Sequence, residues 1–560
     1  MEGTKKRRRE LLFRCLGYLL PYKKELAAAA AALLGVTAAG FLQPLAIRKI
    51  MDDGMIEKDM AGILFFSCLL GALVVASQAL EFFQTKIFVK IHNASYEAVS
   101  LQVFDKVLRL RKDFFTDRKN GEIINCLTLD MMQVTSVTDR YIVMSAGHVF
   151  RIVSGSAGLF LISPGLAMAV LAMIPLKYLS VRRLSAQREK NMGEDIEANR
   201  RFSRWFDDTL DGIGEVHLWN LGGQRKETFG RLLRELLAVR EKGSMTDAWN
   251  LFTEMVLSWG VDVALYILGG ALVCRGDLTV GAVVAFISYS GYVTGPVASL
   301  INLKMHFARI LPSAERLFSF LDREEESSGT RELPEGVCAP VLCFDGVRFS
   351  YGEGREVLKG VSFRIMPGEK VAFIGKNGSG KSTIFNLLLR FYEPCGGKIT
   401  ADGIPVGEFP VDEYRGLFSV VSQEPYLFMD SIAGNVDLSG KRSREEVERA
   451  LKQSGAAEFI GKFPEGERTQ TGNKGTKLSG GEKQKLAVAR ALLKDAPVVL
   501  LDEASSGYDV ESDAYLHHII THEMEGKTVL MITHHYHQLE GFDRIFYLED
   551  GRLRERLNTP

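Results

Sequence analysis

The chain has 560 residues, and its 69 lysines and arginines balance 69 aspartates and glutamates, so the formal net charge is zero. Apolar residues make up 46% and charged residues 25%, a composition that excludes disorder for the bulk of the chain. Nucleic-acid-binding proteins usually carry a basic excess, so we expect no nucleic-acid partner. The seven cysteines form no CxxC pair, which favours free thiols over a disulfide framework.

Apolar residues are concentrated in the first half of the chain. A membrane-spanning helix needs about 20 apolar residues. Four charge-free runs and two weaker stretches predict six spans, at about 26–47, 60–83, 138–162, 165–181, 248–273 and 278–303. A tight turn at Ser163-Pro164-Gly165 would separate the third span from the fourth. A soluble domain would have to bury all four charge-free runs, which argues against that alternative.

The two weaker stretches carry ionisable residues. His148 and Arg151 lie in the third predicted span, and Glu254 and Asp262 lie in the fifth. A charge at the bilayer centre costs about 2.5–3.5 kcal/mol on insertion scales, so such residues usually face a cavity or a partner. They are candidates for substrate contact or gating. The alternative is that Arg151 pairs with an acid from a neighbouring span or lies at the membrane edge.

Basic residues indicate the orientation of the spans. The run from Lys5 to Arg9 places the N-terminus in the cytosol and suits contact with lipid head groups. The connections on the cytosolic side, about 84–137 and 182–247, are then long, and the first can hold two helices of about 25 residues. We therefore expect an all-α transmembrane domain over 1–322, with six spans and long cytosolic helical extensions.

An acidic linker, 323–336, precedes a change of composition to alternating strands and helices over 337–560, which predicts an α/β domain. The strand Val371–Ile374 leads into a match to GxxxxGK[ST], the phosphate loop of ATPases. Its glycines let backbone N–H groups approach phosphate, and the following helix directs its positive end at the anion. The predicted nucleotide-binding residues are Gly375, Lys376, Asn377, Gly378, Ser379, Gly380, Lys381, Ser382 and Thr383.

Lys381 is expected to reach the β and γ phosphates of ATP, and Ser382 to ligate Mg²⁺. A second apolar strand, Val498–Leu501, ends in Asp502 and Glu503. Asp502 is placed to bind Mg²⁺ through water, and Glu503 to polarise the attacking water. These residues predict ATP hydrolysis.

A second phosphate-binding helix start is predicted at Ser479, Gly480 and Gly481, before the helical stretch 483–493. One domain cannot easily aim two such ends at one γ-phosphate, whereas a second copy facing head to tail can. The chain is therefore expected to work with a second copy of itself or a homologous chain.

With these motifs in this order, the chain resembles ATP-binding cassette transporters, specifically half-transporters of the exporter type. The resemblance covers nearly the whole chain. It implies adenine stacking on Tyr351, Mg²⁺ sensing by Gln423, a link between the two sites through Asp509, and a γ-phosphate contact from His534. It also implies short coupling elements near 113–122 and 204–212.

Three positions depart from the family pattern. Glu482 stands where glutamine is commonest, Ser506-Gly507-Tyr508-Asp509 replaces Ser-Ala-Leu-Asp, and His535 replaces an arginine. His518 and His522 have the i, i+4 spacing of a metal site, but no cysteine or carboxylate set completes it, so we interpret them as a polar helix surface.

The sequence thus predicts ATP-driven export of a peptide, lipid or amphipathic small molecule by a dimer in the plasma (inner) membrane, with both termini cytosolic. Three alternatives stay open. The chain could be half of a heterodimeric exporter that is inactive alone, or a channel or regulator that ATP gates. It could also be a soluble cassette ATPase, which the six predicted spans argue against.

Overall fold

The computed structural model describes residues 2–116, 123–124, 126–138, 140–333, 339–352, 354–503, 517–534 and 539–557. The chain divides into two compact units. The first comprises Met1–Leu108 and Asn120–Arg323, and the second comprises Arg109–Lys119 and Glu324–Pro560. Of the predicted transmembrane domain, the described residues 109–116 are grouped with the second unit.

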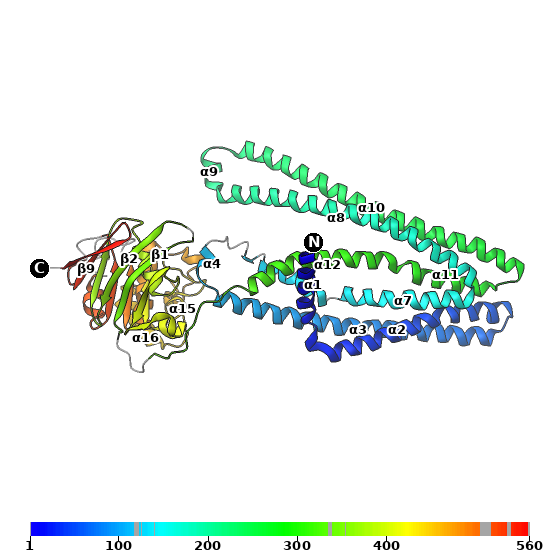
Figure 1. The fold of residues 1–560 in the computed structure, drawn as a ribbon, viewed down its shortest axis with the longest axis horizontal. Coiled ribbons are helices and arrows are strands. Elements are labelled where there is room, and N and C mark those ends of the chain that lie inside the picture. The colour runs from blue at the N-terminus through cyan, green and yellow to red at the C-terminus, as the bar shows by residue number, and fades with distance from the viewer. Residues whose placement is uncertain are drawn as a thin grey trace. The chain divides into compact units, whose positions relative to one another are not determined.

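The first unit consists of helices over its described residues (Figure 1). Its main helices are α1 (Glu2–Gly17), α2 (Lys23–Lys49), α3 (Met60–Arg109, whose last residue belongs to the second unit), α7 (Arg140–Ile162), α8 (Pro164–Asp211), α10 (Gly222–Arg275), α11 (Val280–Thr294) and α12 (Pro296–Leu321). Two short helices, α6 (Met131–Thr135) and α9 (Ile213–Leu218), lie in the long connections.

Among the described residues, four helical segments are long and apolar enough to cross a membrane: Leu20–Ile56, Met60–Arg109, Pro164–Asp211 and Gly222–Arg275. Two shorter apolar helices, Gly147–Ile162 and Val280–Thr294, fall within the predicted third and sixth spans. The pair α8 and α10 runs side by side, joined by α9 (Figure 1). The apolar windows of the four long segments are mostly unburied within this single chain, as expected of surfaces that face lipid or a partner.

Local chemistry fixes the turns between the spans. Ser163 alone separates α7 from α8, where its hydroxyl accepts a hydrogen bond from the Leu166 N–H and Pro164 occupies the first helical position. α10 ends at Gly276, whose φ of 81° is in the left-handed region. Thr279 then caps α11 by accepting from the Ala282 N–H at 3.1 Å.

The connection 84–137 begins with a continuation of α3 to Arg109, as one of the expected helical extensions. The structure corrects two other expectations about the membrane half. The predicted span 278–303 is divided at Gly295 into α11 and α12, because Pro296 cannot donate a backbone hydrogen bond. Residues 204–211 continue α8, which contains no glycine or proline there, so the short element follows Gly212 as α9.

The second unit contains two sheets. One is antiparallel, in the order β2-β1-β4-β5, and the other has the order β10-β9-β3-β8-β7-β6, parallel except for β10. The strands are β1 (Leu342–Ser350), β2 (Glu356–Ile365), β3 (Lys370–Ile374), β4 (Gly396–Ala401), β5 (Ile404–Pro405), β6 (Phe418–Val421), β7 (Val498–Asp502), β8 (Thr528–Ile532), β9 (Arg544–Glu549) and β10 (Arg552–Leu557). This is the predicted α/β domain.

Helices cover these sheets and form a separate helical core. They are α13 (Lys381–Leu388), α14 (Val411–Gly416), α15 (Ile432–Val436), α16 (Arg444–Gln453), α17 (Ala457–Ile460) and α18 (Gly480–Lys494), and the short α4 (Asp113–Thr116) also belongs to this unit. Strands β3, β7 and β8 are buried along almost their whole length, as near-continuous apolar strands in a parallel sheet should be. Their carboxyl ends meet at one edge, where the candidate site lies.

Candidate functional site

The phosphate loop connects β3 to α13, and its glycines adopt conformations that other residues avoid. Gly375, Gly378 and Gly380 have φ values of 152°, 76° and 108°. A Cβ at Gly375 would overlap the Leu548 carbonyl oxygen. The loop therefore needs glycine for close packing as well as for its dihedral angles.

Lys381 folds back over this loop. Its Nζ donates to the carbonyl oxygens of Gly375 at 2.8 Å and Lys376 at 3.2 Å. Burial lowers the pKa of Lys381, while the nearby Glu503 and Asp502 carboxylates oppose that change. The ammonium group is thus held in the position where the motif places phosphate.

A buried hydroxyl supports the same assignment. The Ser379 Oγ is inaccessible to solvent and has no hydrogen-bond partner among the described residues. A buried donor without a partner costs about 1–3 kcal/mol. A cavity of about 280 Å³ is lined by Lys376, Asn377, Gly378 and Ser379. This loop therefore fits a phosphate group, which would accept the unused hydrogen bond.

Acidic and amide side chains converge at the carboxyl end of β7. The Ser382 hydroxyl donates to Asp502 at 3.2 Å. Burial raises the pKa of Asp502, and the Ser382 hydrogen bond opposes that change. A carboxylate beside a hydroxyl offers oxygen ligands of the kind that Mg²⁺ prefers.

Glu503 joins two other predicted residues. One carboxylate oxygen accepts from the Gln423 Nε2 at 2.7 Å, and the other lies 2.6 Å from the His534 Nε2. The Glu503 backbone N–H donates to the Ile532 carbonyl at 2.9 Å, which ties this residue to the end of β8. The structure thus brings together the three residues predicted for catalysis.

Tyr351 lies beside the same loop. Its hydroxyl is 3.2 Å from the Thr383 hydroxyl, and its ring meets Phe349 and Tyr392 edge to face, with centroids at 4.8 and 5.1 Å. The ring remains 42% exposed. An exposed aromatic face next to a phosphate loop can stack on a base.

Ser479, Gly480 and Gly481 begin α18 in a complete capping box. The Ser479 hydroxyl accepts from the Glu482 N–H at 3.3 Å, and the Glu482 carboxylate accepts from the Ser479 N–H at 2.7 Å. Glu482, the first departure from the family pattern, therefore keeps the capping box closed. Asp509, with the rest of the Ser506–Asp509 motif, and His535 lie outside the described residues.

Sequence reasoning missed two residues that connect α18 to the rest of the site. Gln484, which is almost fully buried, donates to the Gln423 carbonyl at 3.2 Å. Arg490 donates to the Tyr426 carbonyl at 2.6 Å and to the Asn435 Oδ1 at 2.8 Å, and burial lowers its pKa to about 10. The only sequence signal was a polar residue on an otherwise apolar face of the helix.

Charged residues of the first unit also have partners. The Arg151 Nη2 in α7 donates to the Glu81 Oε1 in α3 at 3.0 Å. This is the alternative that we left open for Arg151, an acid from a neighbouring span. Lys177 in α8 is buried and donates to the Ser258 hydroxyl in α10 at 3.1 Å. A further polar atom, the His148 Nδ1, is buried without a hydrogen-bond partner among the described residues.

The second unit has a phosphate loop after β3, an Asp-Glu pair after β7 of the same sheet and a capped serine-glycine helix start. Joined to long apolar helices, these features define the class of ABC transporters. Residues 26–297 match the family model of the ABC transporter transmembrane region, and residues 358–506 match that of the ABC transporter. The chain belongs to this family. It is a multi-pass membrane protein with an ATP-binding domain, an exporter-type half-transporter that couples ATP hydrolysis to export.

The chain is also similar to individual proteins over nearly its full length. The chain is 31% identical to the ATP-dependent lipid A-core flippase of Pseudomonas aeruginosa, over 98% of this chain and 93% of the relative. It is 30% identical to the protein of the same name from Chromobacterium violaceum, over 97% of this chain and 93% of the relative. A solved bacterial Atm1-family ABC exporter with ATP bound shares the fold, with a TM-score of 0.81, 24% identity and coverage of 95% of this chain and 94% of that chain.

Proposed function

We propose that the chain forms a homodimer in the inner membrane, with both termini cytosolic, and moves an amphiphilic lipid across the bilayer at the cost of ATP. The observation that carries the lipid assignment is the near full-length similarity to proteins named lipid A-core flippases. The basic run at the N-terminus supports the orientation.

In this proposal, Lys381, Ser379 and the loop N–H groups hold the phosphates of ATP. Ser382, Asp502 and Gln423 hold Mg²⁺, whose charge stabilises the negative charge that develops on the phosphates. Glu503 polarises the attacking water. His534, whose Nε2 lies 2.6 Å from the Glu503 carboxylate, contacts the γ-phosphate. The hydrogen bonds of Glu503 to Gln423 and His534 support these roles.

A second copy completes each site. Ser479, Gly480 and Gly481 of one copy are proposed to bind the γ-phosphate held by the phosphate loop of the other, and Asp509 to link the two sites. Two features of this chain support a homodimer: it carries both the phosphate loop and the capped helix start of α18.

The intramembrane polar residues are proposed to bind the lipid head group. Glu81, Gln84, His148 and Arg151 form one polar cluster between α2, α3 and α7. Lys177 forms a second polar cluster between α8 and α10 with Glu254 and Asp262, whose carboxylates interact electrostatically with its ammonium group. Polar groups at these positions can contact a head group that apolar spans would exclude.

The proposal is tested in proteoliposomes with a fluorescent phospholipid whose outer-leaflet molecules are bleached by dithionite. We expect ATP to change the protected fraction with the wild-type chain and not with Glu503→Gln. Addition of lipid A-core should compete with the labelled lipid. Steady ATP hydrolysis without movement of either lipid would contradict the lipid assignment.

A further inference from the structure

Arg415, in the last turn of α14, binds the far end of the phosphate-loop helix. Its Nε donates to the Leu389 carbonyl at 2.9 Å, and its Nη2 donates to the Arg390 carbonyl at 3.1 Å. Both carbonyls directly follow α13, which begins at Lys381 in the phosphate loop. Carbonyls at a helix C-terminus have no partner within the helix, and a cation there also complements the helix dipole. Arg415 is thus attached to the helix that carries the nucleotide contacts.

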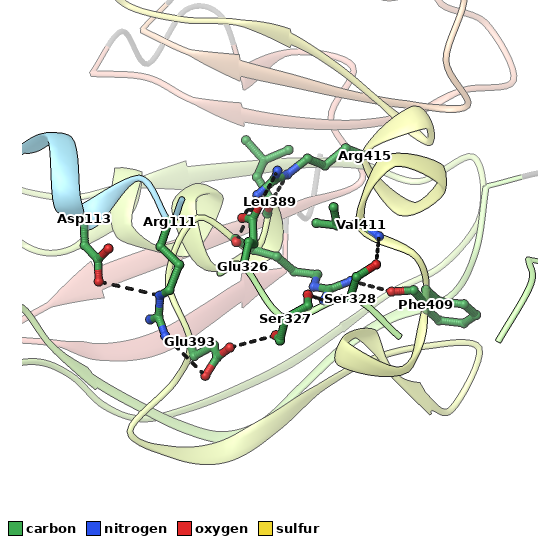
Figure 2. Close-up of polar contacts among 11 residues, drawn as sticks. Arg111, Asp113, Glu326, Ser327, Ser328, Leu389, Glu393, Phe409, Val411 and Arg415 are labelled. Carbon is green, nitrogen blue, oxygen red and sulfur yellow. Dashed lines mark hydrogen bonds and ion pairs between the residues drawn. The ribbon is translucent and has the colours of Figure 1, made fainter. Parts of the chain in front are cut away.

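The same guanidinium binds the linker that leads from α12. The Arg415 Nη1 donates to the Glu326 Oε2 at 2.8 Å, and its Nη2 donates to the other carboxylate oxygen (Figure 2). The two side chains are only 26% and 17% exposed. A bidentate pair that is partly shielded from water is stronger and more directional than an exposed ion pair.

Further contacts hold the linker against the same surface. Arg390 donates to the Ser327 carbonyl at 2.6 Å and to the Phe409 carbonyl at 2.8 Å. The Ser327 hydroxyl donates to Glu393 at 3.0 Å, as Figure 2 shows. The Gly329 N–H donates to the Phe409 carbonyl at 3.1 Å. The linker is therefore held against the segment that comes just after α13.

The end of the long helix α3 joins the same cluster. The Glu326 N–H donates to the Arg109 carbonyl at 2.9 Å. The ring of Phe391 lies between two cations, with Lys112 Nζ 4.2 Å and Arg415 Cζ 4.9 Å from its centroid. Residues 109 and 324 are two of the three points at which this unit is joined to the first unit, and the segments beginning there thus meet at Glu326, the partner of Arg415.

We propose that Arg415 is a positioning residue that transmits occupation of the phosphate loop to the linker and to the end of α3. It touches neither nucleotide nor substrate. When ATP immobilises the start of α13, the hydrogen bonds of Arg415 extend this immobilisation from the end of the helix to Glu326. The hydrogen bond from the Glu326 N–H extends it to Arg109. This inference concerns how the ATPase drives the membrane half, and it holds whatever substrate is moved.

Hydrogen exchange of the full-length chain in lipid nanodiscs tests this directly, with adenylyl imidodiphosphate and Mg²⁺ as the probe. In the wild type, we expect the nucleotide to slow exchange in peptides covering the phosphate loop and also in those covering 324–333, whose amides at 326, 329 and 331 are hydrogen-bonded. In Glu326→Gln and Arg415→Gln, the phosphate-loop peptide should remain protected. The response of the linker peptide should fall at least about fivefold.

Arg331→Gln is the matched control, because Arg331 forms an exposed ion pair with Glu408 in the same linker, with side chains 57% and 50% exposed. It should respond as the wild type does. Arg415→Lys keeps the charge but not the bidentate geometry, so it should give an intermediate response. In ATPase assays, Glu326→Gln should lower kcat and leave KM for ATP within about twofold.

Two outcomes would overturn the proposal. One is a linker response in Glu326→Gln equal to that of the wild type. The other is loss of nucleotide protection at the phosphate loop itself in both variants, because the pair would then only support the fold of the nucleotide unit.

Discussion

At the scale of single residues, Ser379 offers the clearest test of nucleotide contact, because its buried hydroxyl has no partner among the described residues. Ser379→Ala should weaken ATP binding about tenfold, since a hydrogen bond to a charged group contributes about 1.5–3 kcal/mol. It should not lower the thermal stability of the nucleotide-free protein, because no bond within the fold is lost. Titration with ATP and a thermal unfolding curve measure both effects.

Ser419 provides the opposite case as a control. It is also buried, but its hydroxyl donates to the Ala491 carbonyl at 3.1 Å. Ser419→Ala should therefore lower stability by about 1 kcal/mol and leave ATP affinity unchanged. If Ser379→Ala binds ATP as tightly as the wild type, the assignment of this hydroxyl to phosphate is wrong.

At the scale of elements, the start of α18 combines a structural and a functional role. Glu482→Ala removes half of the capping box and should cost about 1 kcal/mol of stability. It should also lower ATPase activity, because Ser479 then loses its fixed position. Glu482→Gln should be nearly neutral, since the amide oxygen can still accept from the Ser479 N–H.

The same box occurs at α16, where Ser443 and Glu446 form both reciprocal bonds. Glu446→Ala should cost similar stability without a loss of ATPase activity. Thermal unfolding and steady-state ATPase rates of the two alanine variants are to be compared. Equal ATPase losses in both would show that the effect is a general loss of stability.

Helix α1 gives a prediction that needs no nucleotide. Cys15 is only 1% exposed, and burial raises the pKa of its thiol to about 11. The thiolate is the reactive form, so at pH 7.5 Cys15 should react with iodoacetamide at least about tenfold more slowly than the exposed Cys395. Peptide mapping by mass spectrometry measures both rates, and denatured protein is the control.

Arg14 contributes to the packing of α1 against α12. It donates to both carboxylate oxygens of Asp322 at 2.6 and 2.8 Å, and its Cζ lies 4.2 Å from the centroid of the Phe318 ring. Asp322→Asn should therefore speed the alkylation of Cys15. Rapid alkylation of Cys15 in the folded wild type would contradict the placement of α1 against α12.

At the scale of the whole molecule, local motifs carry most of what the sequence predicts. The phosphate loop needs glycine, lysine and serine at fixed spacing, so its geometry at Gly375–Ser382 follows from the sequence. Apolar length likewise predicts the long helices of the membrane half. Fold class is predictable for this reason, whereas the roles of Gln423 and His534 were implied by the resemblance to the transporter family.

Contacts between distant parts of the chain were beyond sequence reasoning. Nothing near Arg151 indicates that Glu81, 70 residues earlier, is its partner. Arg415 lies in an ordinary short helix, and its role depends on Glu326, 89 residues away. The pair Gly295-Pro296 indicates the break in the sixth predicted span. The prediction missed this break because the apolar run continues across the pair.

We propose that this chain alone assembles a complete ATP-driven exporter. The Mg²⁺-dependent ATPase rate of the purified chain in lipid nanodiscs, measured beside Glu503→Gln, tests this. We expect robust hydrolysis by the wild type and its near loss in the variant, with ATP retained. Negligible hydrolysis by a well-folded wild-type chain, or rapid turnover by Glu503→Gln, would contradict it.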